Sequence, residues 1–192
     1  MKTAAKSLFL ALPLALAPVA LAQHQSFAIN PDSSKVAFSL GGNTHHVDGI
    51  FHVQSGSIGF DRGAQSIAGS VVVAAGSGNS GDQGRDKKMN TDVLEVAHYA
   101  EISFVPKSYQ GTIAATGDST LQITGIFTLH GTPHDMTVPM QIHIDGATLE
   151  AKTHFTIPYV KWGLKDPSIF ILKVAKDVDI DLTLVGSLFS SN

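Results

Sequence analysis

Apolar and polar residues alternate with a period of two along much of this chain. The clearest runs are residues 138–145 (VPMQIHID) and 178–184 (VDIDLTL), in which every second side chain is apolar. Because successive side chains of a β-strand point to opposite faces, this alternation predicts strands with one buried and one solvent-facing side. The same pattern at 36–40, 121–129 and 155–159 predicts further strands of this kind.

Short breaks that contain glycine separate the predicted strands. Glycine and aspartate favour turns because they accept backbone conformations that other residues avoid. One-sided strands joined by short turns indicate an antiparallel meander that curls into a closed barrel or packs as a sandwich. Closure is favoured because it leaves no free strand edge. The breaks lie at residues 41–42, 61–63, 117–118, 131 and 145–146.

One segment departs from the alternation. In residues 89–99 (MNTDVLEVAHY) the apolar residues follow a helical spacing, and Asn90 or Thr91 offers an N-cap. We expect a short helix here that packs over one end of the barrel. The preceding residues 74–90 are rich in glycine, serine and asparagine, which predicts a loop at a barrel mouth.

Residues 1–22 have the pattern of an export signal. Two lysines precede an apolar stretch at 8–17, and residues 20–22 (ALA) fit a cleavage site made of small residues. The apolar stretch is interrupted by proline and falls short of the roughly 18 to 20 residues that a membrane-spanning helix needs. We therefore expect residues 1–22 to be a cleaved signal peptide. Residues 23–192 then form one exported, periplasmic domain with no membrane span.

The composition excludes several kinds of site and partner. Cysteine is absent, which rules out disulfides, thiolate metal ligands and thiol nucleophiles. Without Lys2 and Lys6 of the signal peptide, the 13 basic residues fall to 11 against 16 acidic ones, a balance of −5. A net negative charge disfavours nucleic acids and anionic membrane surfaces as partners.

Five segments occur in a recognisable order: NPDSSKVAFSL, VDGIFHVQSGSIGFD, GRDKKMNTDVLEVAHYAEISFVPKSY, GIFTLHGTPHDMTVPMQI and WGLKD. Together they resemble the YceI-like family of extracytoplasmic polyisoprenoid-binding proteins. The resemblance is most specific at residues 85–104, followed by residues 129–133, and it extends over nearly the whole exported domain. The chain departs from the family pattern at Ala100, where proline is usual, and at Tyr159, where arginine is usual.

This resemblance implies an eight-stranded antiparallel, lipocalin-like barrel with one or two short helices. Its tunnel would hold the isoprenoid tail of a quinone, a polyprenyl phosphate or a similar amphiphile, with no other cofactor, in a monomer or a homodimer. An eight-stranded barrel is just wide enough to be filled by side chains or to hold one slim ligand. The side chains expected to line the tunnel are Phe38, Phe104, Leu121, Ile123, Phe127, Met140, Ile142, Phe155, Trp162, Ile180 and Leu182.

Three basic residues are candidates for contact with a lipid head group. Arg85, Lys87 and Lys88 are expected to border the mouth of the tunnel and to face an anionic or carbonyl group. The alternative is that Arg85 forms a structural ion pair with an acid such as Asp86 or Glu95.

Trp162, the single tryptophan, lies in the turn segment KWGLKDPS. Two roles are open for it, a rim aromatic that contacts the ligand or a plug that closes one end of the barrel.

Other functions find less support in the sequence. The chain has nine histidines, but the spacing His130-x-x-x-His134 crosses a Gly-Thr-Pro turn, which does not favour a zinc or copper site. A hydrolase is disfavoured because the chain has no Gly-x-Ser-x-Gly motif. A structural interaction module with a filled barrel remains an alternative. We expect a non-catalytic lipid carrier.

Overall fold

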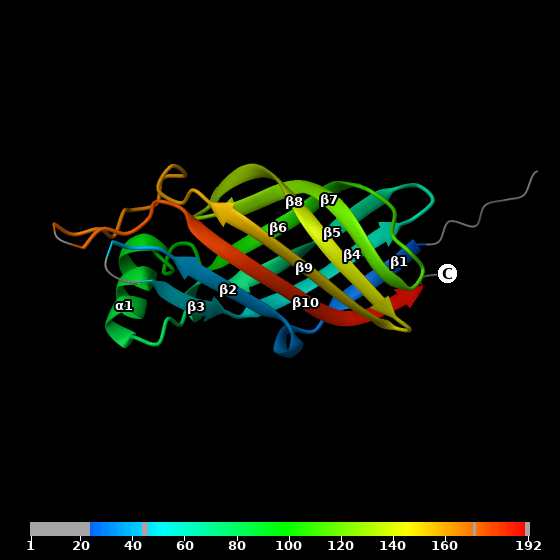
Figure 1. The fold of residues 1–192 in the computed structure, drawn as a ribbon, viewed down its shortest axis with the longest axis horizontal. Helices are drawn as coiled ribbons and strands as arrows, with labels where there is room; N and C mark the ends of the chain where they lie inside the picture. Colours follow the sequence, from blue (N-terminus) through cyan, green and yellow to red (C-terminus); the bar gives the residue numbers. More distant parts are fainter. Residues whose placement is uncertain (1–23, 44–45, 171, 191–192) are drawn as a thin grey trace, which may run out of the picture.

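The computed structural model describes residues 24–43, 46–170 and 172–190, and the predicted signal peptide lies outside them. Ten β-strands make up most of this described part of the chain (Figure 1). In order they are β1 (His24–Ile29), β2 (Lys35–Leu40), β3 (Val47–Phe51), β4 (Val53–Asp61), β5 (Ser66–Ala74), β6 (Glu101–Gln110), β7 (Gly117–Leu129), β8 (Thr132–Asp145), β9 (Thr148–Ile157) and β10 (Val178–Ser190).

The strands form a closed antiparallel barrel. From β4 to β10 each strand pairs with the next, and β1 pairs with both β4 and β10, which closes the sheet. β1 and β2 pair with successive halves of β10, and β3 and β4 are separated by His52 alone, so each of these two pairs acts as one long strand. The described residues therefore build a barrel of eight strands, and the fold implied by the family resemblance is confirmed.

Alternate burial along the long strands confirms the predicted pattern. In β8, Val138, Met140, Ile142 and Ile144 are buried, whereas the residues between them are exposed. β7 and β9 alternate in the same way. Because Leu121 of β7 lies opposite Met140, inward side chains of neighbouring strands lie side by side and form one apolar interior.

The helical segment begins earlier than the sequence pattern predicts. α1 (Gln83–Lys88) continues as a π-helical turn (Met89–Val93), so the expected loop contains a helix. Asp82 caps it instead of Asn90 or Thr91, and its carboxylate accepts a hydrogen bond from a backbone N–H three residues later. Apolar spacing marked only the part of the segment that packs on the barrel, because the first turn is polar. None of the described helices is long and apolar enough to cross a membrane.

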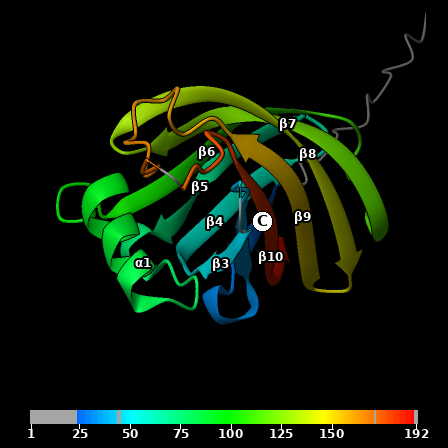
Figure 2. The ribbon, with the colours of Figure 1, turned by 60° about the vertical axis from the view of Figure 1, so that its left-hand side comes forward.

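The two ends of the barrel differ. α1 and the loop of residues 158–177, which joins β9 to β10, lie at one end, and Figure 2 shows this end turned forward. At the other end the Tyr109 hydroxyl donates a hydrogen bond to the carbonyl oxygen of Asp61 at 3.1 Å. The Arg62 guanidinium donates to the carbonyl oxygen of Ala114 at 3.2 Å. These bonds tie the turn after β4 to β6 and to the loop that follows β6, and they stabilise this end of the barrel. The opposite end, which carries α1, is called the mouth.

Candidate functional site

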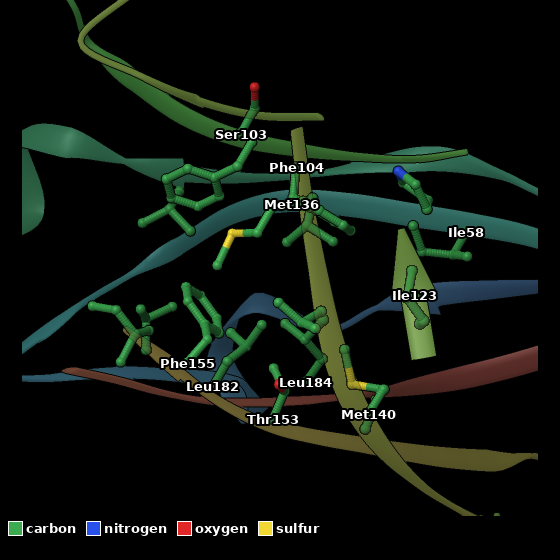
Figure 3. Close-up of a pocket in the computed structure, with 18 of the residues that line it drawn as sticks. Ile58, Ser103, Phe104, Ile123, Met136, Met140, Thr153, Phe155, Leu182 and Leu184 are labelled. Atoms are coloured by element: carbon green, nitrogen blue, oxygen red, sulfur yellow. The ribbon is translucent and has the colours of Figure 1, made fainter. Parts of the chain in front are cut away.

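The barrel encloses a cavity of about 160 Å³, called here the inner cavity. Its lining contains two polar residues, Ser103 and Thr153, and is otherwise apolar. Figure 3 shows the Ser103 hydroxyl pointing away from the other labelled side chains. Among the described residues, Thr153 therefore supplies the one polar side-chain group on the wall of the inner cavity. Apolar cavities of about 150 Å³ stay dry and bind small hydrocarbons, so a space of this size and lining prefers apolar atoms to water.

Most of the residues predicted to line a tunnel lie on the inner cavity. Phe38 lies instead on a second cavity nearer the mouth, and Ile180 lines both cavities. Trp162 lines neither of them. The predicted residues on the inner cavity are Phe104, Leu121, Ile123, Phe127, Met140, Ile142, Phe155, Ile180 and Leu182.

A wider cavity of about 480 Å³ opens beside the inner one and is called the mouth cavity. It is bordered by α1 and the turn that follows, by β2 and β3, and by residues 164–169, 172 and 174 of the loop between β9 and β10. The two cavities adjoin because they share lining residues. Those shared residues are Phe51, Ile102, Leu129, Ile157 and Ile180. An apolar interior thus leads to a mouth that carries charged side chains, which suits an amphiphile with a long tail.

Arg85 borders the mouth cavity but is held by its neighbours. Its guanidinium donates hydrogen bonds to Ser80, to Oγ at 2.7 Å and to the carbonyl oxygen at 2.8 Å. The Ser80 hydroxyl in turn donates to the Asp86 carboxylate. Arg85 is therefore linked to Asp86 through Ser80, and neither of the expected direct ion pairs, with Asp86 or with Glu95, is formed in the described structure.

The two predicted head-group lysines lie differently. Lys88 lines the mouth cavity, whereas Lys87 is exposed on α1 and does not line it. A further lysine that the sequence analysis did not single out, Lys165, also lines the mouth, with its Nζ 3.8 Å from Asp92 Oδ2. The mouth thus contains cationic groups from both α1 and the long loop.

The model of the YceI-like domain matches residues 27–186 of the chain. The chain belongs to the YceI-like domain family. No curated protein matches it.

Solved structures similar to this YceI-like domain share its fold. BcnA of Burkholderia cenocepacia is 22% identical with a TM-score of 0.67, over 82% of this chain and 99% of that one. A polyisoprenoid-binding domain from Saccharophagus degradans, implicated in plant cell wall breakdown, is 15% identical with a TM-score of 0.63, over 86% and 98%. The YceI protein of Campylobacter jejuni is 14% identical with a TM-score of 0.53, over 92% and 91%.

Tyr159 of this YceI-like domain anchors the start of the loop at the mouth. Its side chain is buried, and its hydroxyl donates a hydrogen bond to the carbonyl oxygen of Ala175 at 2.7 Å. Burial, followed by the negative charges of Asp166 and Asp177, raises the pKa of Tyr159 to about 12. The phenol is therefore a neutral hydrogen-bond donor at neutral pH and joins the two ends of the loop.

The histidines considered as metal ligands make other contacts. The His134 ring stacks on Trp162, with ring centroids 3.9 Å apart. His130 Nε2 lies 3.3 Å from Glu95 Oε2, and its ring centroid lies 4.0 Å from that of Tyr99. Within the described ranges, no three histidine or carboxylate side chains come together in a group that could hold a metal ion.

The part of the wall that β4 and β5 supply was not predicted from the sequence. Ile58 and Phe60 from β4 and Ile67, Val71 and Val73 from β5 line the inner cavity. The three residues from β5 share one parity, so the signal was present. It was weakened by glycines and small residues between them, which lower the contrast between the two faces.

Proposed function

We propose that this YceI-like domain is a periplasmic carrier for a long-chain isoprenoid or similar amphiphilic lipid, such as a quinone or a polyprenyl phosphate, and is not an enzyme. The observation that carries this proposal is the apolar inner cavity that adjoins a wider, charged mouth. Family membership and the likeness to a polyisoprenoid-binding domain support it. The predicted signal peptide at residues 1–22 supports a periplasmic location.

The size of the hydrophobic effect favours a long tail as the main source of affinity. Each buried methylene contributes about 0.8 kcal/mol, so twenty tail carbons give roughly 16 kcal/mol before the cost of association, about 4–15 kcal/mol, is deducted. A short metabolite gains much less. A tail of this length needs both cavities, because the inner one by itself has the size that holds one small hydrocarbon. With both filled, the tail suffices for binding, and polar contacts decide which lipid is preferred.

The lining of the inner cavity supports binding over catalysis. General acid–base and nucleophilic catalysis need an ionisable or activated side chain within reach of the substrate. No acid, base, histidine or tyrosine is among the residues that line the inner cavity in the described chain. A ligand held there meets apolar side chains that exclude water and the hydroxyl of Thr153.

Native mass spectrometry of protein exported by its own signal peptide and extracted in mild detergent tests the proposal. We expect a bound species with the mass of an isoprenoid lipid. Lipid-free protein that also takes up neither a prenylated quinone nor a polyprenyl phosphate in titration contradicts the carrier function and favours an interaction module.

A pair of neighbouring variants makes the test specific to the interior. Ala151 lines the inner cavity, and Lys152 beside it on β9 is exposed. Ala151→Phe fills the cavity and should abolish lipid uptake while thermal unfolding remains cooperative, whereas Lys152→Phe should leave uptake unchanged. Equal uptake by both variants contradicts an interior site.

A further inference from the structure

The inner cavity contains one polar group that nothing in the described structure satisfies. Thr153 is 8% exposed, and its Oγ1 has no hydrogen-bond partner. It lies on β9 between the inward-facing Ala151 and Phe155, opposite Leu182 of β10. The side chain therefore belongs to the wall of the inner cavity.

A hydroxyl among hydrocarbon groups is costly unless it finds a partner. Valine has nearly the same shape as threonine and would complete an apolar wall at no such cost. A ligand made of hydrocarbon alone at this depth leaves Thr153 Oγ1 unpaired, whereas a ligand oxygen beside it restores the hydrogen bond. The presence of the hydroxyl thus points to a polar atom on the ligand.

The partner must be uncharged. No lysine, arginine or histidine lines the inner cavity in the described residues, so a phosphate or carboxylate at this depth would be buried without a counter-charge. Carbonyl and hydroxyl oxygens carry no such penalty and bond well to a single hydroxyl.

The register of β9 gives the depth. Ile157 lines both cavities and marks where they adjoin, and Thr153 lies four residues further along the same strand. At about 3.3 Å per residue, this is roughly 13 Å along the tilted strand, and roughly 7 Å from the level of Phe155, which lies opposite Ile180, another residue that lines both cavities. A polar group that stays at the mouth does not reach it.

We propose, building on the carrier function, that the bound amphiphile enters the barrel with an uncharged carbonyl or hydroxyl oxygen that hydrogen-bonds to Thr153 Oγ1. The lipid is then of the quinone or prenyl alcohol class, with its oxygen inside the barrel. A polyprenyl phosphate, whose oxygens are all at its charged end, does not satisfy the site.

Thr153→Val tests this with two probes of matched chain, a prenylated benzoquinone and the hydrocarbon squalene. We expect the affinity for the quinone to fall about 5- to 20-fold, because one buried hydrogen bond is lost, and the affinity for squalene to stay equal or rise. Thr153→Ser keeps the hydroxyl and should retain the preference for the quinone. Thr148→Val, an exchange at an exposed position of β9, is the control and should change neither affinity.

The outcomes separate this inference from the carrier function. If Thr153→Val changes both affinities by the same factor, or neither, the hydrogen bond is contradicted while carriage stands. If the unaltered protein binds neither probe, the carrier function fails, and the inference fails with it.

A separate observation concerns the outside of the mouth. Ile169 and Leu172 are 54% and 45% exposed, and Phe170 is 95% exposed. Of the large hydrophobic side chains exposed to this degree in the described chain, the remaining one is Phe189, on the last strand. Ile169 and Leu172 also line the mouth cavity, so this exposed apolar patch is continuous with the entrance.

The charge of the same loop is opposite to that of the chain. Residues 158–177 contain four lysines and two aspartates, whereas the whole sequence has a net charge of −3. The negative overall charge argues against an anionic surface as a general partner, but the loop presents apolar side chains flanked by cations. This combination is typical of segments that insert into the interface of an anionic bilayer.

We infer that the patch of Ile169, Phe170 and Leu172 docks on an anionic lipid bilayer, so that the mouth cavity faces the membrane. Co-sedimentation with vesicles of phosphatidylcholine mixed with phosphatidylglycerol tests this. Phe170→Ser should weaken binding about 10-fold or more, since burial of one phenyl ring is lost, and high salt should weaken it further. Phe189→Ser is the control for exposed phenylalanine and should bind as the unaltered protein does.

Equal vesicle binding by Phe170→Ser and the unaltered protein contradicts the docking surface. So does a change of oligomeric state in Phe170→Ser without a change in vesicle binding, which indicates that a second copy covers the patch. Quinone uptake from detergent solution should be the same in both proteins, which keeps this result independent of the carrier function.

Discussion

The imidazole ring of His134 lies flat on the indole ring of Trp162, with ring centroids 3.9 Å apart and ring planes inclined by 7°. His134 belongs to β8 and Trp162 to the loop that follows β9, so the stack fastens that loop to the barrel wall. Behind the stack, Phe127 lies 5.8 Å from the indole ring and lines the inner cavity. His134 shares the inward parity of Met136 and Val138, which line the inner cavity, so Trp162 packs inside the mouth end of the barrel against its wall.

Removing the stack should loosen the mouth loop. Trp162→Ala is expected to lower the free energy of unfolding by about 2 kcal/mol, less than for a fully buried tryptophan because the ring is half-buried. A double-mutant cycle with His134→Ala, followed by urea denaturation, should show a coupling energy of about 0.5–1.5 kcal/mol. Additive effects of the two changes contradict a stabilising stack.

Lys88, one of the two lysines that line the mouth cavity, should favour anionic head groups. Lys88→Gln is expected to weaken binding of a polyprenyl phosphate probe about two- to fivefold, the effect of one exposed charge pair, and to leave prenylated quinone binding unchanged. Lys87→Gln, one residue away and outside the mouth cavity, is the matched control. Titration calorimetry with both probes measures these affinities. Equal losses of affinity for the polyprenyl phosphate in both variants indicate that the overall charge of α1, and not a contact of Lys88, is responsible.

The buried phenol of Tyr159 should make the protein less stable at high pH. Its pKa is raised from 10 to about 12, so the folded state disfavours the charged phenolate. The contribution is fully present below pH 10 and is lost as the pH rises toward 12, by about 2 kcal/mol at most. Denaturation of Tyr159→Phe, which lacks the phenol, should show a smaller loss over this window. If the free energy of unfolding falls by the same amount with pH in both proteins, the Tyr159 phenol is not the group responsible.

The seam between the first and last strands should not tolerate a side chain at Gly186. A Cβ there would lie 2.0 Å from the carbonyl oxygen of Ala28, which is backbone and cannot move aside. Gly186→Ala is therefore expected to lower the free energy of unfolding by about 3 kcal/mol or more. Gly146→Ala, in an open turn with nothing within 4 Å, should cost about 1 kcal/mol from its positive φ alone. Similar urea midpoints for the two variants contradict a closed seam.

Residues of the candidate site could be predicted from the sequence where the direction of a side chain depends only on its position along a strand. Phe104, Leu121 and Met140 line the inner cavity because they stand on the inward parity of strands whose alternation is visible in the sequence. Thr153 shares that parity, yet a polar residue in such a run gives no sign that it is buried. The contact of Arg85 with Ser80 was likewise invisible, because a short loop brings the two together.

By itself, the sequence determined the family and those strands whose alternation is clear, such as β7, β8 and β10, with their inward faces, because each depends on neighbours along the chain. The tertiary structure decided what distant segments do together. The pairing of β1 with β10, the stacking of His134 on Trp162 and the joining of the two cavities each bring together residues that are far apart in sequence. No local pattern records such contacts, because they exist only once the sheet has closed on itself.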